Sequence, residues 1–285
     1  MTITTTSKVW LITACSSGFG REMTLAALAR GDKVIATARD PKKLTELAAR
    51  GATTMALDVT SSDEALKRVI AEAVNVYGRI DVLVNNAGYI LQGAVEECST
   101  KEIFDQFNTN VFGALAVLRA VLPHMRARRS GVIANMGSIG GWDGHVNAGL
   151  YCSSKFALAA LSISLKGELE HLGIEVTCIE PGYFRTNFLS SGHRNKAANE
   201  IQDYVDATAP VAKGLDAYNK NQPGDPVKGA KVIVEALSGD YGKKLPARLA
   251  LGSDAVKFID GIIEKSRTTL EEWAPLVKNT DCEDV

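Results

Sequence analysis

The chain has 285 residues, which is long enough for one large domain with a well-buried core and too short to require two full-size domains. Its 32 Lys and Arg residues nearly balance its 33 Asp and Glu residues, and no basic face carries interleaved aromatics, so we expect no nucleic-acid partner. No apolar run reaches the ~20 residues of a membrane-spanning helix. The five cysteines are scattered singly, which argues against a zinc site. We therefore expect one domain over residues 1–285 that binds a small molecule and no metal.

The two ends of the chain show no recognisable targeting signal. Residues 1–8 are rich in threonine and run directly into an apolar segment, without the charged start and cleavage site of a signal peptide. Near the other end, Glu283 and Asp284 occupy positions that a prenylation signal fills with aliphatic residues, so an acidic tail is the better interpretation. With the unpaired cysteines, these features predict a cytoplasmic protein.

Short apolar segments rich in β-branched residues alternate along the chain with longer segments of helical periodicity. Strands are predicted at residues 9–13, 33–38, 53–57, 81–84, 131–136, 174–179 and 248–251. Helices are predicted at residues 18–30, after Pro41, and at 62–76, 101–128, 150–172, 227–237 and 255–268. This alternation predicts an α/β fold, a doubly wound, mostly parallel seven-stranded sheet of Rossmann type with helices on both faces.

Two segments near the end of the chain depart from this alternation. Between residues 187 and 226 the periodicity weakens, and polar and turn-forming residues surround short helical pieces such as 200–209. A segment of this length in a compact domain is usually a lid or binding loop, so we expect a substrate-binding loop there. Residues 253–285 are expected to form a C-terminal helix and tail.

The first strand and the first helix are joined by a loop with the sequence TACSSGFG, residues 13–20. At such a junction, backbone N–H groups and the helix dipole can hold a pyrophosphate. Turns of this kind also occur without any ligand, so the loop alone does not decide between a cofactor site and an ordinary turn.

The end of the second predicted strand indicates which nicotinamide cofactor would bind. An acidic residue at this place accepts hydrogen bonds from the ribose of NAD, whereas a cation suits the additional phosphate of NADP. Arg39 stands there, with Lys42 and Lys43 following. Asp40 is the competing ribose acceptor, but Asp before Pro41 is more simply a helix N-cap. The combination favours NADP(H), although a lone Arg39 could also be a solvated surface residue.

A candidate catalytic group lies on and around the helix predicted at 150–172. Tyr151 and Lys155 are four residues apart and therefore project from one face of that helix. This spacing is common by chance, so other residues are needed to show whether the pair is catalytic. Ser138 follows a predicted strand, as ligand-binding groups do in parallel sheets. Asn110 falls inside a predicted helix, where Asn has no propensity advantage and is as often structural as functional.

Taken in order, these motifs resemble those of the short-chain dehydrogenase/reductase family over nearly the full length, to about Leu251. The resemblance also extends to Asp58-Val59, the run NNAG at 85–88, YCSSK at 151–155 and PGYFRT at 181–186. Some segments are similar to the subgroup that contains 17β-hydroxysteroid and retinol dehydrogenase-like enzymes. The resemblance implies catalytic roles for Asn110, Ser138, Tyr151 and Lys155. It implies cofactor contacts from Ser16, Ser17, Gly18, Phe19, Gly20, Arg39, Lys43, Asp58, Val59, Asn86, Ala87, Gly88, Tyr151, Lys155, Pro181, Gly182, Phe184 and Thr186.

One position departs from the family pattern. Ala14 stands where the family normally has the first glycine of the loop. An added methyl group is tolerated if the φ angle of this residue is negative and is costly if φ is positive. We expect Ala14 to weaken or shift the affinity for the cofactor rather than abolish it.

These features predict an NADP(H)-dependent oxidoreductase that interconverts a hydrophobic ketone or aldehyde and its alcohol, with Tyr151 as general acid/base. The expected pocket walls are Ile90-Leu91, the 140–149 turn with Trp142 and His145, Tyr183-Phe184, and the 187–226 loop with Phe188 and Leu189, although Trp142 could be plain packing. Two alternatives are a non-catalytic NADP-binding regulator and a lyase or epimerase on the same fold.

The family resemblance also implies a homodimer or homotetramer formed through the helices at 101–128 and 150–172. Ala157, Leu158, Leu161 and Leu165 supply an apolar stripe on the second of these helices. The stripe suits either this contact or packing on the sheet, and the sequence does not separate the two.

Overall fold

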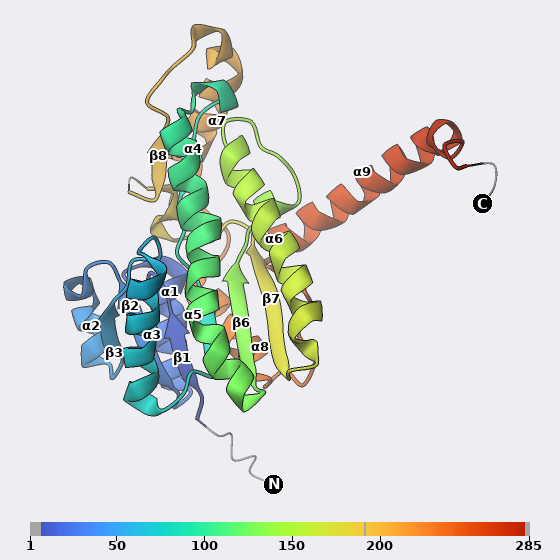
Figure 1. The fold of residues 1–285 in the computed structure, drawn as a ribbon. Helices are drawn as coiled ribbons and strands as arrows, with labels where there is room; N and C mark the ends of the chain where they lie inside the picture. Colours follow the sequence, from blue (N-terminus) through green and yellow to red (C-terminus); the bar gives the residue numbers. More distant parts are fainter. Residues whose placement is uncertain (1–6, 191, 283–285) are drawn as a thin grey trace.

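A sheet of seven parallel strands forms the centre of the protein, whose computed structural model describes residues 7–190 and 192–282 (Figure 1). The strands are β1 (Val9–Ile12), β2 (Lys33–Ala38), β3 (Thr53–Ala56), β4 (Val82–Asn85), β6 (Gly131–Met136), β7 (Ile174–Pro181) and β9 (Arg248–Leu251). Their spatial order is β3-β2-β1-β4-β6-β7-β9. The chain winds outward in one direction from β1 and in the other from β4, so the predicted doubly wound α/β fold is confirmed.

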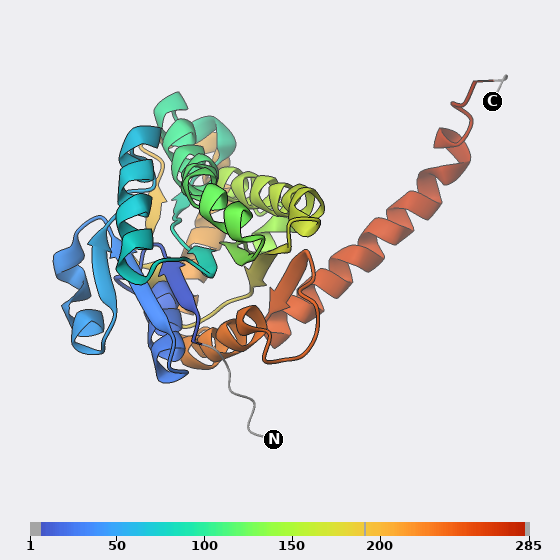
Figure 2. The same ribbon diagram turned by 60° about the horizontal axis from the view of Figure 1, so that its bottom comes forward.

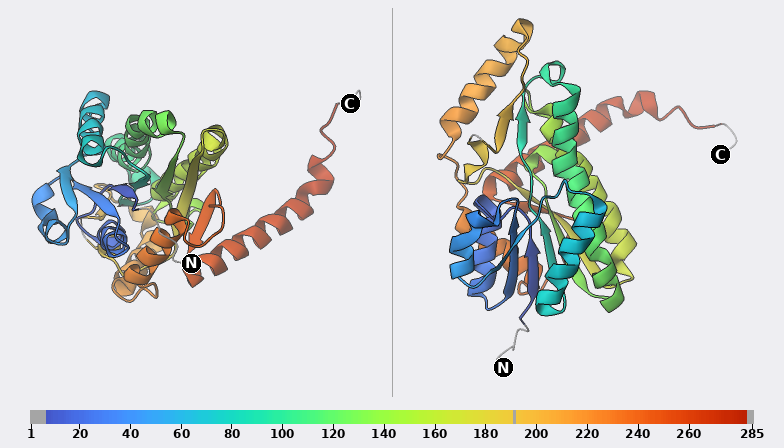
Figure 3. Two further views of the ribbon diagram at one scale, coloured as in Figure 1. Left: turned by 90° about the horizontal axis from the view of Figure 1, so that it is seen from below. Right: turned by 60° about the vertical axis from the view of Figure 1, so that its left-hand side comes forward.

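Helices cover both faces of this sheet (Figure 3). One face carries α1 (Gly18–Ala29), α2 (Thr45–Ala49) and α8 (Pro226–Ser238). The other carries α3 (Asp63–Tyr77), α5 (Gly113–Arg128) and α6 (Gly149–Glu170), with α4 (Thr100–Phe107) above α5. Short 3-10 turns occupy Pro41–Leu44, Val95–Glu97, Ile139–Gly141, Asn187–Leu189 and Gln202–Tyr204.

Strand β1 shows why the sheet requires two covering layers. All four of its residues are buried, and their side chains alternate between the faces. Val9 and Leu11 pack toward α3 and α5, whereas Trp10 and Ile12 pack toward α1 and α8. A strand that is apolar on both sides is typical of a parallel sheet and cannot be left open to water on either face.

The structure differs from the sequence prediction in four places. A second, two-stranded sheet pairs β5 (Ile90–Gln92) with β8 (Arg194–Lys196), strands that are too short to show a period. The helix predicted at 101–128 is interrupted by a π-helical segment at Asn108–Phe112. Helix α7 (Val205–Tyr218) lies later than the predicted piece and continues through Pro210. Helix α9 (Ser253–Val277) runs well past residue 268.

Two further expectations can be compared with the structure. Of the stripe predicted on α6, Leu158 is buried and Leu165 lies against the core, whereas Ala157 and Leu161 are half-buried; Phe156 and Ile163 are the exposed large apolar side chains of this helix. Within the described ranges, no helix is both long enough and apolar enough to cross a membrane. The expectations for residues 1–6 and for the acidic end, Glu283 and Asp284, lie outside the described residues.

Candidate active site

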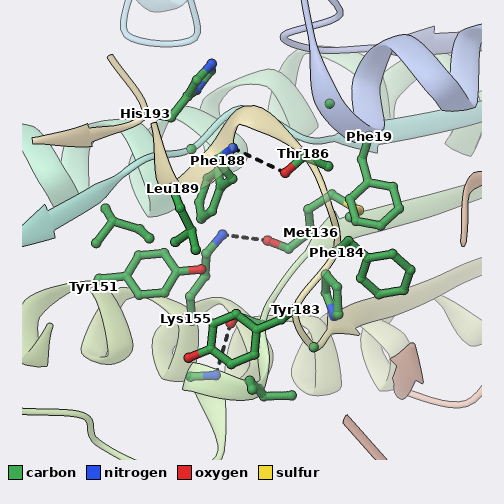
Figure 4. A pocket seen from close by; sticks show the side chains of 18 of the residues that line it. Phe19, Met136, Tyr151, Lys155, Tyr183, Phe184, Thr186, Phe188, Leu189 and His193 are labelled. Atoms are coloured by element: carbon green, nitrogen blue, oxygen red, sulfur yellow. Dashed lines mark hydrogen bonds between the residues drawn. The ribbon is translucent and has the colours of Figure 1, made fainter. Parts of the chain in front are cut away.

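A cavity of about 250 Å³ opens at the carboxyl ends of the strands, beneath β8 and α7 (Figure 4). In a doubly wound sheet this edge is where ligands bind. Twelve of the site residues predicted from the sequence line this cavity: Ser17, Gly18, Phe19, Asn86, Gly88, Ser138, Tyr151, Lys155, Pro181, Gly182, Phe184 and Thr186. Residues that are far apart in the chain are thus brought to one cavity, because β1, β4, β6 and β7 all end at the same edge of the sheet.

Tyr151 and Lys155 lie one helical turn apart in α6, and both side chains are buried. The ammonium group of Lys155 lies 5.7 Å from the centre of the Tyr151 ring and donates a 2.6 Å hydrogen bond to the carbonyl of Met136. Met136 is the last residue of β6, and Ser138 follows two residues later. Helix α6 and the end of β6 therefore hold a phenol, an ammonium and a hydroxyl group around the cavity (Figure 4).

Burial shifts the proton affinities of this group. It raises the pKa of Tyr151, and a hydrogen bond from Ser138 acts in the opposite direction. Burial also lowers the pKa of Lys155 to about 8, which leaves the amine mostly charged at neutral pH. A phenol with so high a pKa needs nearby positive charge before it can release a proton, and the ammonium group of Lys155 provides such a charge.

Asn110 lies within the π-helical segment and behind the cavity wall. Its side-chain amide donates to the carbonyl of Tyr89 and accepts from the backbone N–H of the same residue, both at 3.1 Å, and it also donates to Ser154. A methyl group added to Gly88 would lie 3.2 Å from the oxygen of Asn110 and 3.5 Å from the nitrogen of Lys155. Asn110 is therefore close to Lys155, and π-helical segments are frequent at functional sites.

The loop after β1 has the geometry of a phosphate cradle. Gly18 has a φ angle of 55°, and a side chain on Gly20 would lie 2.5 Å from the carbonyl oxygen of Ala14, so neither position suits another residue. Asn86, after β4, donates hydrogen bonds to the carbonyls of Thr13 and Ala14 at 3.0 and 3.2 Å. The loop is thus fixed from the neighbouring strand, and Ser17, Gly18 and Phe19 are left facing the cavity.

Ala14 has a positive φ angle, which is the conformation expected to be costly for a residue with a side chain. Its φ angle is 57°, in the left-handed region, which costs a residue with a Cβ atom about 1–2 kcal/mol. We expect Ala14→Gly to raise the stability by about 0.5–1 kcal/mol after the larger entropy of the unfolded glycine chain is subtracted. Thermal unfolding should shift upward by ~2 °C.

The matched control for this change is Ala71→Gly, at an exposed position in the middle of α3. The same loss of a methyl group should there lower the stability by about 0.5–1 kcal/mol, because helix interiors disfavour glycine. A fall in the melting temperature for both variants would show that Ala14 carries no strain.

The remaining predicted cofactor residues do not line this cavity. Arg39 and Asp58 line a second hollow beyond β2 and β3. Asp40 accepts a hydrogen bond from the backbone of Lys42, which confirms that it is an N-cap. Ser16 and Lys43 are exposed outside both hollows, Val59 packs against Gly113, and Ala87 donates its backbone N–H to Thr13.

Several known proteins are similar to this chain in architecture and in sequence. The family described as short chain dehydrogenase matches residues 8–197. The chain belongs to the short-chain dehydrogenase family of oxidoreductases. A crystal structure of a short-chain dehydrogenase from Streptomyces avermitilis is 42% identical, with a TM-score of 0.88, covering 97% of this chain and all of that one.

Two further relatives extend the comparison. Oxidoreductase BOA17 of Botryotinia fuckeliana is 34% identical over 274 residues, which cover 95% of this chain and 98% of that protein. The structure described as ElxO with NADP bound is 25% identical, with a TM-score of 0.71, and covers 88% of this chain and 99% of that one.

Several lining residues of this short-chain dehydrogenase were not predicted from the sequence. His193, beside β8, places its Nε2 atom 3.2 Å from the hydroxyl of Ser17, and its pKa is lowered by burial and by the charge of Arg39. Val211 and Leu215 reach the cavity from α7. None of them belongs to a motif, and only the spacing of four between Val211 and Leu215 could have indicated a shared face.

Gln222 is the most unusual of the unpredicted lining residues. It is 1% exposed, and neither polar atom of its side chain has a hydrogen-bond partner in the described part of the chain. A buried amide without partners costs free energy unless a ligand or water satisfies it. This side chain is therefore a polar group on the cavity wall that a ligand can use.

Trp142 is not a wall of the pocket, which corrects one expectation. Its ring lies 3.7 Å from the guanidinium of Arg248, and its N–H donates to Glu180, which is itself paired with Arg248. Burial raises the pKa of Glu180, while both partners oppose that rise. Leu91 is likewise buried outside the lining. The other predicted walls, including Ile90, line the cavity.

No metal centre accompanies these groups in residues 7–190 and 192–282, where no three His, Cys, Asp or Glu side chains are gathered around one point.

Proposed function

We propose that this protein is an NADP(H)-dependent oxidoreductase that interconverts a hydrophobic ketone or aldehyde and the corresponding alcohol. The observation that carries the proposal is that Tyr151, Lys155 and Ser138 share one cavity with the Ser17–Phe19 loop. A proton donor and a loop that can bind a dinucleotide thus face the same cavity. The NADP bound to the similar ElxO structure supports the choice of cofactor.

The residues of the chain divide the chemical work among them. When bound, the nicotinamide supplies or accepts a hydride. Tyr151 delivers a proton to the carbonyl oxygen of the substrate, or removes it from the alcohol, through its phenol oxygen. Ser138 donates a hydrogen bond to the same oxygen as negative charge develops on it. The positive charge of Lys155 stabilises the phenolate form of Tyr151, and its ammonium group orients the cofactor ribose.

Other residues hold this group in place and bind the cofactor. Asn110 holds the backbone at Tyr89 by hydrogen bonds, and this fixes the neighbouring Gly88 against which the ammonium group of Lys155 lies. Ser17, Gly18 and Phe19 offer backbone N–H groups to the pyrophosphate, with Thr186 across the cavity. Arg39 suits the additional phosphate of NADP because its guanidinium can bind a phosphate through two parallel hydrogen bonds.

The substrate side of the cavity is mainly apolar. Ile90, Tyr151 and Leu189 form one buried cluster with Cys152, and Phe188 and Leu215 pack against it. Such walls favour a substrate with a sizeable hydrocarbon part. Gln222 offers a place for one polar group on that substrate or on the cofactor.

The proposal is tested by following the absorbance of reduced cofactor. Purified protein is mixed with NADPH or NADH and a panel of aliphatic, aromatic and polycyclic ketones and aldehydes. We expect NADPH to be consumed in proportion to the alcohol formed, and faster than NADH. Substrate turnover without net consumption of cofactor would indicate a lyase or epimerase, and NADPH binding without turnover of any compound would indicate a regulator.

A further inference from the structure

Helix α9 extends away from the rest of the molecule, as three views agree (Figure 1, Figure 2, Figure 3). Its 25 residues span about 37 Å at 1.5 Å per residue. Only Ala255 and Ile259, near its beginning, are buried. The second half of the helix therefore has no support from its own domain.

The projecting helix nevertheless carries an apolar stripe. Large apolar side chains recur with the three-and-four spacing of helices that pack side by side. The stripe begins beside the buried Ile259 and consists of Val256, Ile262 and Ile263 and, after Ser266 and Arg267, of Leu270, Trp273, Leu276 and Val277. Leu270 is 69% exposed, Leu276 67% and Trp273 54%. An exposed patch of this kind marks an interaction site.

The charges of α9 and its end show what kind of surface can cover the stripe. Residues 253–282 contain four basic and six acidic side chains. A helix that binds anionic lipid carries an excess of Lys and Arg on its polar face, which this one lacks. The occupant is thus a protein surface with an apolar stripe of its own.

We infer that the stripe on α9 pairs antiparallel with the same stripe of a second copy of this chain. Each domain is attached to the beginning of its α9, so antiparallel pairing places the two domains at opposite ends, whereas parallel pairing would force them together. Lys265 and Glu272 lie seven residues apart on one edge of the stripe. In the antiparallel pair, Lys265 of each copy faces Glu272 of the other. In a parallel pair the same edge positions of the two helices lie on opposite sides of the pair, so these charges would not meet.

The area of the stripe matches what such a contact needs. Its exposed side chains present on the order of 500 Å² of apolar surface. Two copies together would bury ~1,000 Å², the lower limit for a specific interface. This pairing is independent of the proposed activity and adds an assembly contact outside α5 and α6.

The first test measures the mass of the full-length protein in solution by light scattering and sedimentation. We expect two or four times the 30.5 kDa of one chain. The variant Leu270→Glu/Trp273→Glu should have half the mass of the wild type at the same concentration, because association is at least ~100-fold weaker. The control Thr268→Glu, on the opposite side of α9, should keep the mass of the wild type.

The second test examines the antiparallel register. Lys265→Glu alone should weaken association, and Lys265→Glu/Glu272→Lys should restore it, since the two opposite charges are exchanged together. Thr269 lies next to the expected two-fold axis, so Thr269→Cys in a Cys282→Ser background should give a disulfide-linked dimer on oxidation. Circular dichroism verifies that each variant is folded.

The inference is overturned if the wild type is monomeric at micromolar concentration, or if the double Glu variant keeps the full mass. A monomer that sediments with vesicles of phosphatidylcholine and phosphatidylglycerol would assign the stripe to a membrane instead. Failure of the double charge exchange to restore association, with no disulfide at residue 269, would reject the antiparallel pairing.

Discussion

Replacing Tyr151 with Phe should lower turnover by at least ~1,000-fold while leaving NADPH binding within about threefold of the wild type. The ring fills the same buried space, but its hydroxyl, the only group in the proposal that exchanges a proton with the substrate oxygen, is lost. Ser138 can still polarise the carbonyl, but no group remains that delivers a proton to the substrate oxygen or removes one from it. The measurement is kcat in both directions, with the NADPH dissociation constant from fluorescence titration.

Tyr183→Phe is the matched control for that variant. Tyr183 lines the same cavity and also loses one phenol hydroxyl, but it packs against Tyr218, 5.1 Å between ring centres, rather than beside Lys155. Its turnover should remain within tenfold of the wild type. Near-normal turnover in Tyr151→Phe would remove Tyr151 from the mechanism, and equal losses in both variants would indicate a general effect on the pocket.

The sheet could be predicted from the sequence because a strand that is buried on both faces appears there as a short apolar segment. β2, β6 and β9 have the predicted bounds, since each contains three consecutive apolar residues. β5 and β8 were missed because three residues show no periodicity. The register of that small sheet depends on contacts between segments about 100 residues apart, which no local pattern contains.

The candidate site was predictable where a residue belongs to a motif and not where it depends on packing. Ser138, Tyr151 and Lys155 occupy recognisable positions, and the structure brings them into one cavity. Gln222 belongs to no motif and is placed only by the path of the loop. The φ angle of Ala14 is a second case, because the sequence showed an unusual residue while the strain appeared only in three dimensions.

The cofactor preference should invert when Arg39 becomes Asp. Arg39 lines the hollow beyond β2 with Asp58, and under the proposal its guanidinium holds the additional phosphate of NADP. Losing a charge-assisted pair costs about 1.5–3 kcal/mol, and a carboxylate next to a phosphate adds repulsion, so NADPH should bind at least ~100-fold more weakly. The same carboxylate can accept hydrogen bonds from the ribose of NAD, so NADH binding should improve.

Arg50→Asp makes the same change of charge at an exposed position outside that hollow, at the end of α2. It separates the loss of a specific contact from a general loss of positive potential, which salt screens beyond about 10 Å. Dissociation constants of NADPH and NADH for the wild type and both variants, measured at one ionic strength, give the comparison. If Arg39→Asp and Arg50→Asp weaken NADPH binding equally, Arg39 does not contact the phosphate, and the preference for NADP must come from another residue around the hollow.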